Sequence, residues 1–192
     1  MPLPGPIWIH RTLSLLAAFT AAVPGCGLTE LSDDNEVGDA SQCEAARTWP
    51  VPFAELEDEL AREIANVRDS GTICDEVEFK GVADLVVVPE LRCAARLDAT
   101  VRAETDDIDQ QSTQVTSAFA RVNLAGYDGV VRHQLIAADY FDAAELFAAW
   151  LDSPEHCAAL LDKNLAHIGI GHSRTADDAR SVFVLLTGEE RD

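Results

Sequence analysis

The first long helical pattern in the chain begins near Pro52. From there, apolar residues recur at steps of three and four with charged residues between them, which is the spacing of one buried helix face. Gly71 follows the last of them, and glycine commonly ends helices. The pattern therefore predicts a helix from Pro52 to Gly71 whose buried face consists of Phe53, Leu56, Leu60, Ile64 and Val67.

Three further helices are expected along the chain. One starts at Pro89, because proline lacks an N–H and fits the first helical position. Another covers about 116–125. Asp142 and Glu145 have the spacing of a capping box and mark the start of the last.

Strands are expected toward the end of the chain. Apolar runs predict them at 130–138, 166–171 and 181–187, the last two joined by a polar turn. Residues 72–88 have no regular pattern. Helices and strands in this order predict an α+β fold and not alternating βαβ units.

The first 25 residues have the pattern of a secretory signal. Their apolar run, 13–23, is eleven residues long, whereas about 20 residues are needed to cross a bilayer. It leads to Val23-Pro24-Gly25-Cys26, which resembles a bacterial lipobox, so we expect Cys26 to be lipidated and to become the mature N-terminus. The alternative is ordinary cleavage nearby with Cys26 free or paired. The expected location is the cell envelope, lipid-anchored on the outer surface or in the periplasm, or outside the cell after secretion.

Acidic residues greatly outnumber basic ones. Asp and Glu number 34 and Lys and Arg 14, so the formal net charge is −20. No basic cluster is visible, which argues against binding to the phosphate backbone of nucleic acids. Residues 26–46 hold six of the acids and no base, which predicts an acidic tether before a domain that covers 47–192.

Lipidation of Cys26 leaves four cysteines, an even number that suits disulfide formation in an oxidising compartment. The disulfide candidates are Cys43, Cys74, Cys93 and Cys157. Three pairings are possible and the sequence does not choose among them; buried free thiols are the alternative. No CxxC pair is present, so a thiolate zinc site is not expected.

Five ordered segments resemble the bacterial branch of the CAP superfamily, also called SCP-like, which comprises cysteine-rich secretory, antigen 5 and pathogenesis-related proteins. They are 57–68, 91–96, 125–127, 150–157 (WLDSPEHC) and 168–171 (IGIG). The last two match the family's W-x-x-S-x-G-H-C and I-G-V-G motifs. The resemblance implies a three-layer α-β-α sandwich with a small antiparallel sheet. It also implies a groove that in many relatives holds two His and one or two Glu, which can bind a divalent metal.

That metal site is largely replaced in this chain. By the resemblance, the family's first His falls on Gln110 and its Glu on Gln134, and only His156 is kept. Glutamine carries no negative charge and is a poor zinc ligand. We therefore expect no metal, no other cofactor and no catalytic residue, but a vestigial groove lined by three neutral hydrogen-bonding groups. Asp107 or Asp109 as displaced ligands is the alternative.

Together these features predict an extracytoplasmic, non-enzymatic domain. It would bind an unidentified ligand or protein through the groove, contact the membrane through the lipid on Cys26, and not bind nucleic acid. One alternative is a hydrolase of cell-wall or secreted polymers with His156 as base or metal ligand. Another is a structural protein whose acidic surface is the interface. A new site that combines His133 with His156 is a further alternative.

Overall fold

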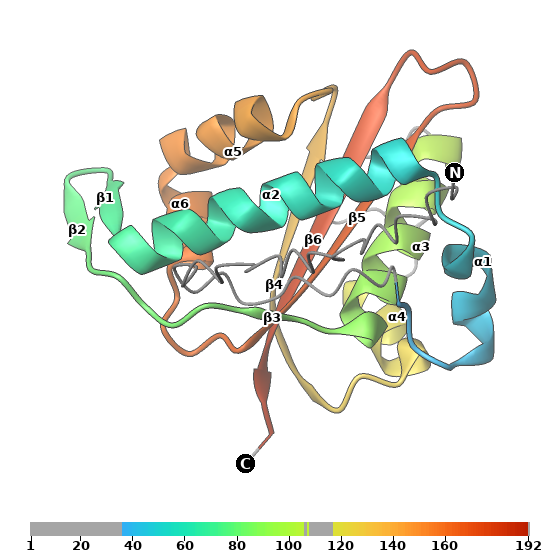
Figure 1. Ribbon diagram of the computed structural model, residues 1–192, viewed down its shortest axis with the longest axis horizontal. Coiled ribbons are helices and arrows are strands. Elements are labelled where there is room, and N and C mark those ends of the chain that lie inside the picture. The colour runs from blue at the N-terminus through green and yellow to red at the C-terminus, as the bar shows by residue number, and fades with distance from the viewer. Residues whose placement is uncertain (1–35, 106, 108–116, 192) are drawn as a thin grey trace, which may run out of the picture.

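The computed structural model describes residues 36–105, 107 and 117–191 (Figure 1). The predicted signal, Cys26 and Gln110 lie outside the described residues. The helices are α1 (Glu44–Arg47), α2 (Val51–Ser70), α3 (Pro89–Thr105), α4 (Ala118–Ala125), α5 (Ala143–Asp152) and α6 (Pro154–Leu160), with a 3-10 turn η1 (Ser41–Cys43) before them. The strands are β1 (Thr72–Cys74), β2 (Val77–Phe79), β3 (Val86–Val87), β4 (Gly129–Ala138), β5 (His167–Arg174) and β6 (Ser181–Glu190). In this described part of the chain, no helix is both long and apolar enough to span a bilayer.

Four strands form the central sheet in the order β3–β5–β6–β4. The neighbours β5 and β6 are antiparallel, as are β6 and β4, and the short β3 runs parallel to β5. Strands β1 and β2 form a separate antiparallel hairpin. The predicted α+β class with a small, mainly antiparallel sheet is confirmed.

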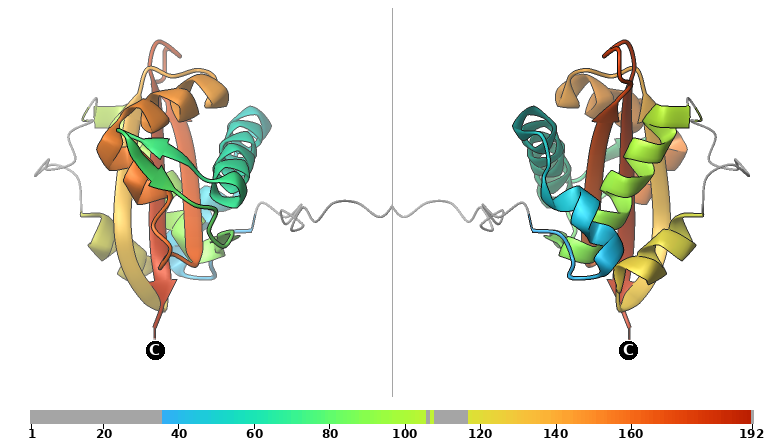
Figure 2. Two further views of the ribbon diagram at one scale, coloured as in Figure 1. Left: turned by 90° about the vertical axis from the view of Figure 1, so that its left-hand side faces the viewer. Right: turned by 90° about the vertical axis from the view of Figure 1, so that its right-hand side faces the viewer.

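Helices cover both faces of the sheet, as the two views in Figure 2 show. α2, α5, α6 and the β1–β2 hairpin lie on one face, and α3 and α4 lie on the other. Fully buried residues of β6 alternate between the two cores: Phe183 and Leu185 pack toward α2 and α5, whereas Val184 and Leu186 pack toward α3. The period-two alternation of one central strand therefore supplies both halves of the sandwich.

Helix α3 contacts β5 backbone to backbone at the two glycines of the IGIG segment. A Cβ at Gly169 would lie 2.1 Å from the Leu91 carbonyl carbon, and one at Gly171 would lie 2.3 Å from that of Ala95. Any side chain at either position would push α3 away from the sheet. This close approach is the physical reason for glycine in the segment.

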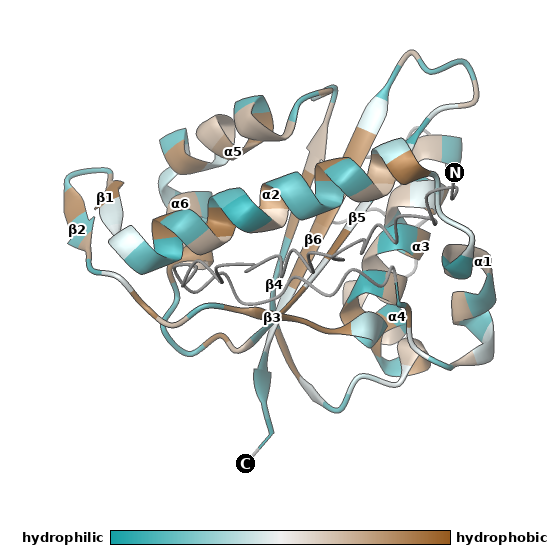
Figure 3. Ribbon diagram, viewed as in Figure 1, coloured by the Kyte–Doolittle hydropathy of each residue, from teal (hydrophilic) through white to brown (hydrophobic). Residues whose placement is uncertain are grey.

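The predicted helices are observed at the positions that the apolar periodicity of the sequence indicated. α2 ends at Gly71, whose φ is 73° and whose N–H bonds to the Val67 carbonyl. At the start of α5, the Asp142 carboxylate accepts the Glu145 N–H at 2.9 Å, as the capping spacing predicted. Figure 3 shows that the visible face of α2 is mostly hydrophilic, while Leu60 and Ile64 are buried on its other face.

Two stretches differ from the sequence prediction. The acidic tether was predicted to reach residue 46, but Val37, Cys43 and Ala46 are buried in the core beside α3. The folded domain therefore begins no later than residue 37, because these apolar contacts hold the acidic segment in place. Residues 72–88, predicted to be irregular, contain the β1–β2 hairpin and β3.

The four cysteines form two disulfides, Cys43–Cys93 and Cys74–Cys157. The first fastens the η1 turn to α3, and the second fastens β1 to α6. Their partners are 50 and 83 residues apart. Loops of this length correspond to about 4 kcal/mol of stabilisation each in the chain-entropy model.

Candidate ligand-binding site

A β-bulge in β4 turns His133 toward helix α6. Val131 pairs with Gly188, and His133 pairs with the adjacent β6 residue Thr187. Arg132, between them in β4, has no paired residue in β6 and is the extra residue of a bulge. Val131 packs in the core on the α3 side of the sheet. Simple alternation would place His133 on that same side, and the bulge sends it to the opposite one.

On that opposite side, His133 meets Asp162 in the turn that follows α6. His133 Nε2 lies 3.3 Å from Asp162 Oδ2, and Asp162 Oδ1 accepts the Asn164 N–H at 3.0 Å. A carboxylate only accepts hydrogen bonds, so Nε2 carries the shared proton and Nδ1 of the neutral ring is an acceptor. Burial acts to raise the pKa of Asp162. The Asn164 N–H, His133 and Arg132 outweigh burial and lower this pKa below its ordinary value.

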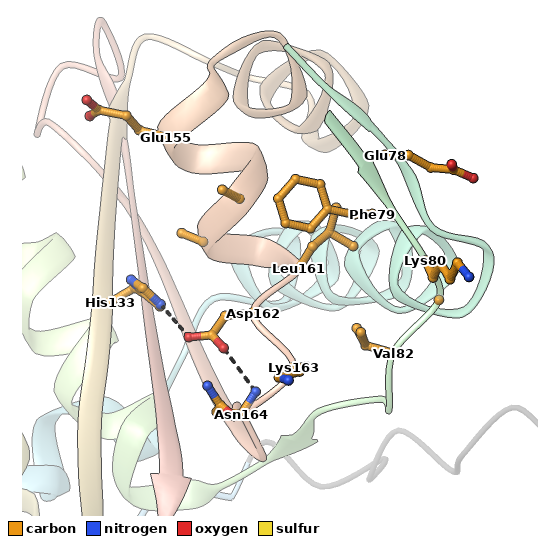
Figure 4. Close-up of a pocket in the computed structure, with 13 residues that line it drawn as sticks. Glu78, Phe79, Lys80, Val82, His133, Glu155, Leu161, Asp162, Lys163 and Asn164 are labelled. Carbon is orange, nitrogen blue, oxygen red and sulfur yellow. Dashed lines mark hydrogen bonds and ion pairs between the residues drawn. The ribbon is translucent and has the colours of Figure 1, made fainter. Parts of the chain in front are cut away.

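The His133–Asp162 pair lies at one end of an open groove of about 870 Å³ (Figure 4). β4 forms one wall, α6 and its following turn form the second, and β2 with its following loop forms the third. The floor is apolar and made by Phe79, Val82, Ala158, Ala159 and Leu161. The polar lining is made by Glu78, Lys80, His133, Glu155, Asp162, Lys163 and Asn164.

Arg68, a fully buried residue of α2, joins two walls of the groove. Its Nη1 donates to the carbonyl oxygens of Leu160 at 2.6 Å and Asp162 at 3.1 Å. Its Nε donates to the Ala83 carbonyl oxygen at 2.9 Å. The Cys74–Cys157 disulfide joins β1, the partner strand of β2, to α6 covalently. The groove is therefore held open by the fold and does not depend on a ligand for its shape.

Gln134 points away from this groove. Its Nε2 donates to Asp98 Oδ2 at 2.6 Å on the α3 side of the sheet. Asp98 is fully buried and also lies 3.0 Å from Arg102 Nε and 3.0 Å from Arg121 Nη2. Burial raises the pKa of Asp98, and the nearby Arg121 and Arg102 oppose that rise without cancelling it. Gln134 is thus a member of a buried ion cluster beneath α3 and α4.

His156 lies in the first turn of α6, as the sequence predicted. Its ring lies 6.3 Å from that of Trp150, measured between centroids, and it is not among the residues that line the groove. Gln134 and His156 therefore lie on opposite faces of the sheet, and the structure does not bring these two predicted residues together. Gln110, the third, lies outside the described residues.

The described residues do not form the divalent-metal site that the family resemblance implies, and Gln110 and Asp109 lie outside them. Within residues 36–105, 107 and 117–191, no three His, Cys, Asp or Glu side chains are positioned to share an ion. Gln134 is engaged by Asp98, and four cysteines are consumed by disulfides. No metal-dependent step can be assigned to these residues.

Sequence reasoning named His133 only as a partner of His156, and it missed Asp162 and the floor of the groove. A signal was present in α6 and its following turn. Glu155, Ala158, Ala159 and Asp162 follow the i, i+3, i+4, i+7 spacing of one helix face. That face carries no large apolar residue, so it is suited to line an open groove, whereas a helix face packed in the core would carry large apolar side chains.

Several solved structures of other proteins are similar to this fold. An outer surface protein of Borrelia burgdorferi has a similar structure, with a TM-score of 0.57 and 24% identity over 71% of this chain and 94% of that one. An extracellular protein of Bacillus anthracis that contains an SCP domain gives 0.53 and 14% identity over 73% of this chain and 40% of that one. A cysteine-rich secretory protein of Staphylococcus aureus gives 0.52 and 16% over the same shares.

At these identities the structural likeness shows the fold alone. A comparison with curated proteins gives no significant match. The model of the cysteine-rich secretory protein family (CAP) matches residues 62–187, about two thirds of the chain. That span runs from α2 to β6 and includes the IGIG contact, the bulge of β4 and the groove. The chain therefore belongs to the cysteine-rich secretory protein family.

Proposed function

We propose that this chain is an extracytoplasmic binding domain that takes its ligand in the groove between β4, α6 and the β2 loop. One observation carries the proposal: the open groove of about 870 Å³ combines an apolar floor with a polar rim. Ligand sites commonly have an apolar lining and a few fixed polar groups that orient the ligand. The His133–Asp162 pair, placed by the bulge and a hydrogen bond, is such a group.

Two observations support the extracytoplasmic location. Disulfides persist in oxidising compartments, and this chain forms two. The similar structures include proteins described as outer surface and extracellular. We extend the proposal to a lipid anchor on Cys26. Expression of the full chain with a radioactive fatty acid tests it: label that is lost in Cys26→Ala supports the anchor, and equal or no label in both chains refutes it.

The lining of the groove favours binding over covalent catalysis. None of the described residues that line it is Ser, Thr or Cys, and Thr187, the cross-strand neighbour of His133, is buried, so no hydroxyl or thiol faces a ligand in the groove. The nearby Cys157 is joined to Cys74. The polar groups of the groove can hydrogen-bond a ligand, but they do not form a nucleophile–base pair.

Filling the groove is the direct test of this proposal. Ala158→Trp places a large ring on the floor, whereas Ala148→Trp places the same ring on an exposed position of α5. We expect small amides and aromatic fragments to shift the backbone NMR signals of groove residues in the wild type and in Ala148→Trp, but not in Ala158→Trp. Fragment shifts confined to the α3–α4 side, or unchanged by Ala158→Trp, would overturn the groove as the site.

A hydrolase is the second candidate, and the His133–Asp162 pair is the observation that favours it. An imidazole oriented by a carboxylate is the base half of many hydrolytic sites. Here the free Nδ1 would act on a water molecule and not on a protein nucleophile. Hydrolysis of a cell-wall or secreted polymer by the wild type, lost in His133→Ala and kept in His156→Ala, would establish this alternative. Equal rates in all three chains would exclude it.

A further inference from the structure

Both lysines of the chain lie on the rim of the groove. The sequence has 34 acidic and 14 basic residues, and its two lysines are Lys80 and Lys163. Both line the groove, and in the described part of the chain no ion pair engages either one. Figure 4 shows the carboxylates of Glu78 and Glu155 at the outer rim, turned away from the floor. In a molecule that repels anions overall, the groove therefore offers two available ammonium groups beside an apolar surface.

Polar and apolar groups follow one another along the groove. Figure 4 shows His133 and Asp162 at one end, Phe79 and Leu161 in the middle, and Lys80 at the other end. A complementary ligand therefore has hydrogen-bonding groups at one end, an apolar group in the middle and a negative charge at the other end.

On the basis of the proposed function, we infer that the groove binds the carboxyl terminus of a polypeptide that ends in an apolar residue. The last side chain lies on Phe79 and Leu161, and the terminal carboxylate faces Lys80, with Lys163 adding attraction from the rim. The preceding peptide group reaches the His133–Asp162 end. The Asp162 carboxylate and the free His133 nitrogen both accept hydrogen bonds, so the backbone N–H groups of the peptide are the donors that this end requires.

An acyl chain with a carboxylate shares the apolar and anionic parts of this chemistry but fits the groove less well. It has no donor or acceptor for the His133–Asp162 end, and covering these groups without partners costs binding energy. The floor also contains two alanines, Ala158 and Ala159, and is open to solvent. It therefore suits one side chain and its backbone better than a long flexible hydrocarbon.

The test compares acetyl-Gly-Ala-Leu with its C-terminal amide by isothermal titration on the oxidised protein. We expect the free acid to bind about tenfold more tightly than the amide, because the amide lacks the charge that Lys80 meets. Lys80→Met should weaken the acid about tenfold and leave the amide unchanged. Lys163→Met should have a smaller effect of about threefold. Glu155→Gln, a matched change on the same rim, should leave binding within about twofold.

Several results would overturn this inference. They are equal binding of acid and amide, no binding of either peptide, or a Lys80→Met effect that is the same for both. Tighter binding of decanoate than of the peptide acid would also overturn it, in favour of an acyl ligand. The NMR experiment with small fragments and the Ala158→Trp variant tests separately whether the groove binds any ligand. A negative peptide titration beside a positive fragment result would therefore refute this inference and leave the proposed function standing.

Discussion

His172 in β5 is an imidazole enclosed by the core. The residue is 0% exposed, its ring stacks on Phe183 with centroids 4.2 Å apart, and it meets Phe53 edge-on at 4.7 Å. Neither ring nitrogen has a hydrogen-bond partner within the described residues. Burial, with a smaller contribution from Arg174, lowers the pKa of His172 to about 4. The neutral ring is therefore part of the folded state at neutral pH.

Acid should destabilise the fold through this one group. The ordinary pKa of a histidine is about 6.5, so the unfolded chain takes up the proton first as the pH falls. The contribution of the neutral ring is fully present above pH 6.5 and is lost as the pH falls toward 4. The gap between the two pKa values corresponds to about 3 kcal/mol in total, of which about 2 kcal/mol lies between pH 7 and pH 5.

We expect His172→Leu to remove this acid sensitivity. Urea unfolding of the oxidised protein at pH 7 and pH 5 gives the free energy of unfolding at each pH, and the wild type should lose about 2 kcal/mol more than the variant. The packing cost of leucine is the same at both pH values, and other groups such as Glu57 titrate in both proteins. Both contributions therefore cancel when the pH-dependent loss of the variant is subtracted from that of the wild type. His156→Leu, at a partly exposed position, should keep the wild-type pH dependence. Equal losses in the wild type and His172→Leu would refute the reasoning.

Three further substitutions test the geometry. Arg68→Met leaves three carbonyl groups of the groove walls without their donor, so urea unfolding should show a loss of about 3 kcal/mol, against less than about 0.5 kcal/mol for the exposed Arg62→Met of the same helix. Gly169→Ala forces a Cβ into the backbone of α3, and we expect a melting temperature about 10 °C lower in a thermal scan. Gln134→Glu sets a second carboxylate against Asp98, so its loss of stability in urea should be larger at pH 7 than at pH 5, where a shared proton relieves the repulsion. Wild-type stability in any of the three would contradict the corresponding contact.

Long amphipathic elements were predictable from the sequence because each repeats one signal many times. The apolar steps of α2 continue over about four turns, and Asp142 marks the start of α5 by a capping contact that is local in sequence. The β1–β2 hairpin gave no such signal. Its strands have three residues each, and its turn uses Asp75 and Glu76 at φ of 47° and 68°. Asn-Gly or Asp-Gly at that turn would have been recognisable.

The candidate site was less predictable because it depends on the face of the sheet from which each side chain projects. His133 and Gln134 are adjacent in β4, and the family resemblance pointed to Gln134. The bulge at Arg132 decides that His133 faces α6, and no period-two pattern reveals an extra residue. Gln134 is bound instead by Asp98, a buried carboxylate from a helix 36 residues away in sequence. Such a partner becomes visible only when α3 and β4 are placed together.

Under the proposed function, the Cys74–Cys157 bridge links ligand binding to the oxidation state of the protein. It joins the hairpin wall of the groove to α6, so a bound ligand loses its own freedom of motion but does not have to order the walls as well. Before oxidation, the same sequence would have to set these walls with Arg68 and apolar contacts alone. If the groove binds a ligand as proposed, oxidation of the thiols fixes its walls for that ligand, and a reducing compartment would leave them less fixed.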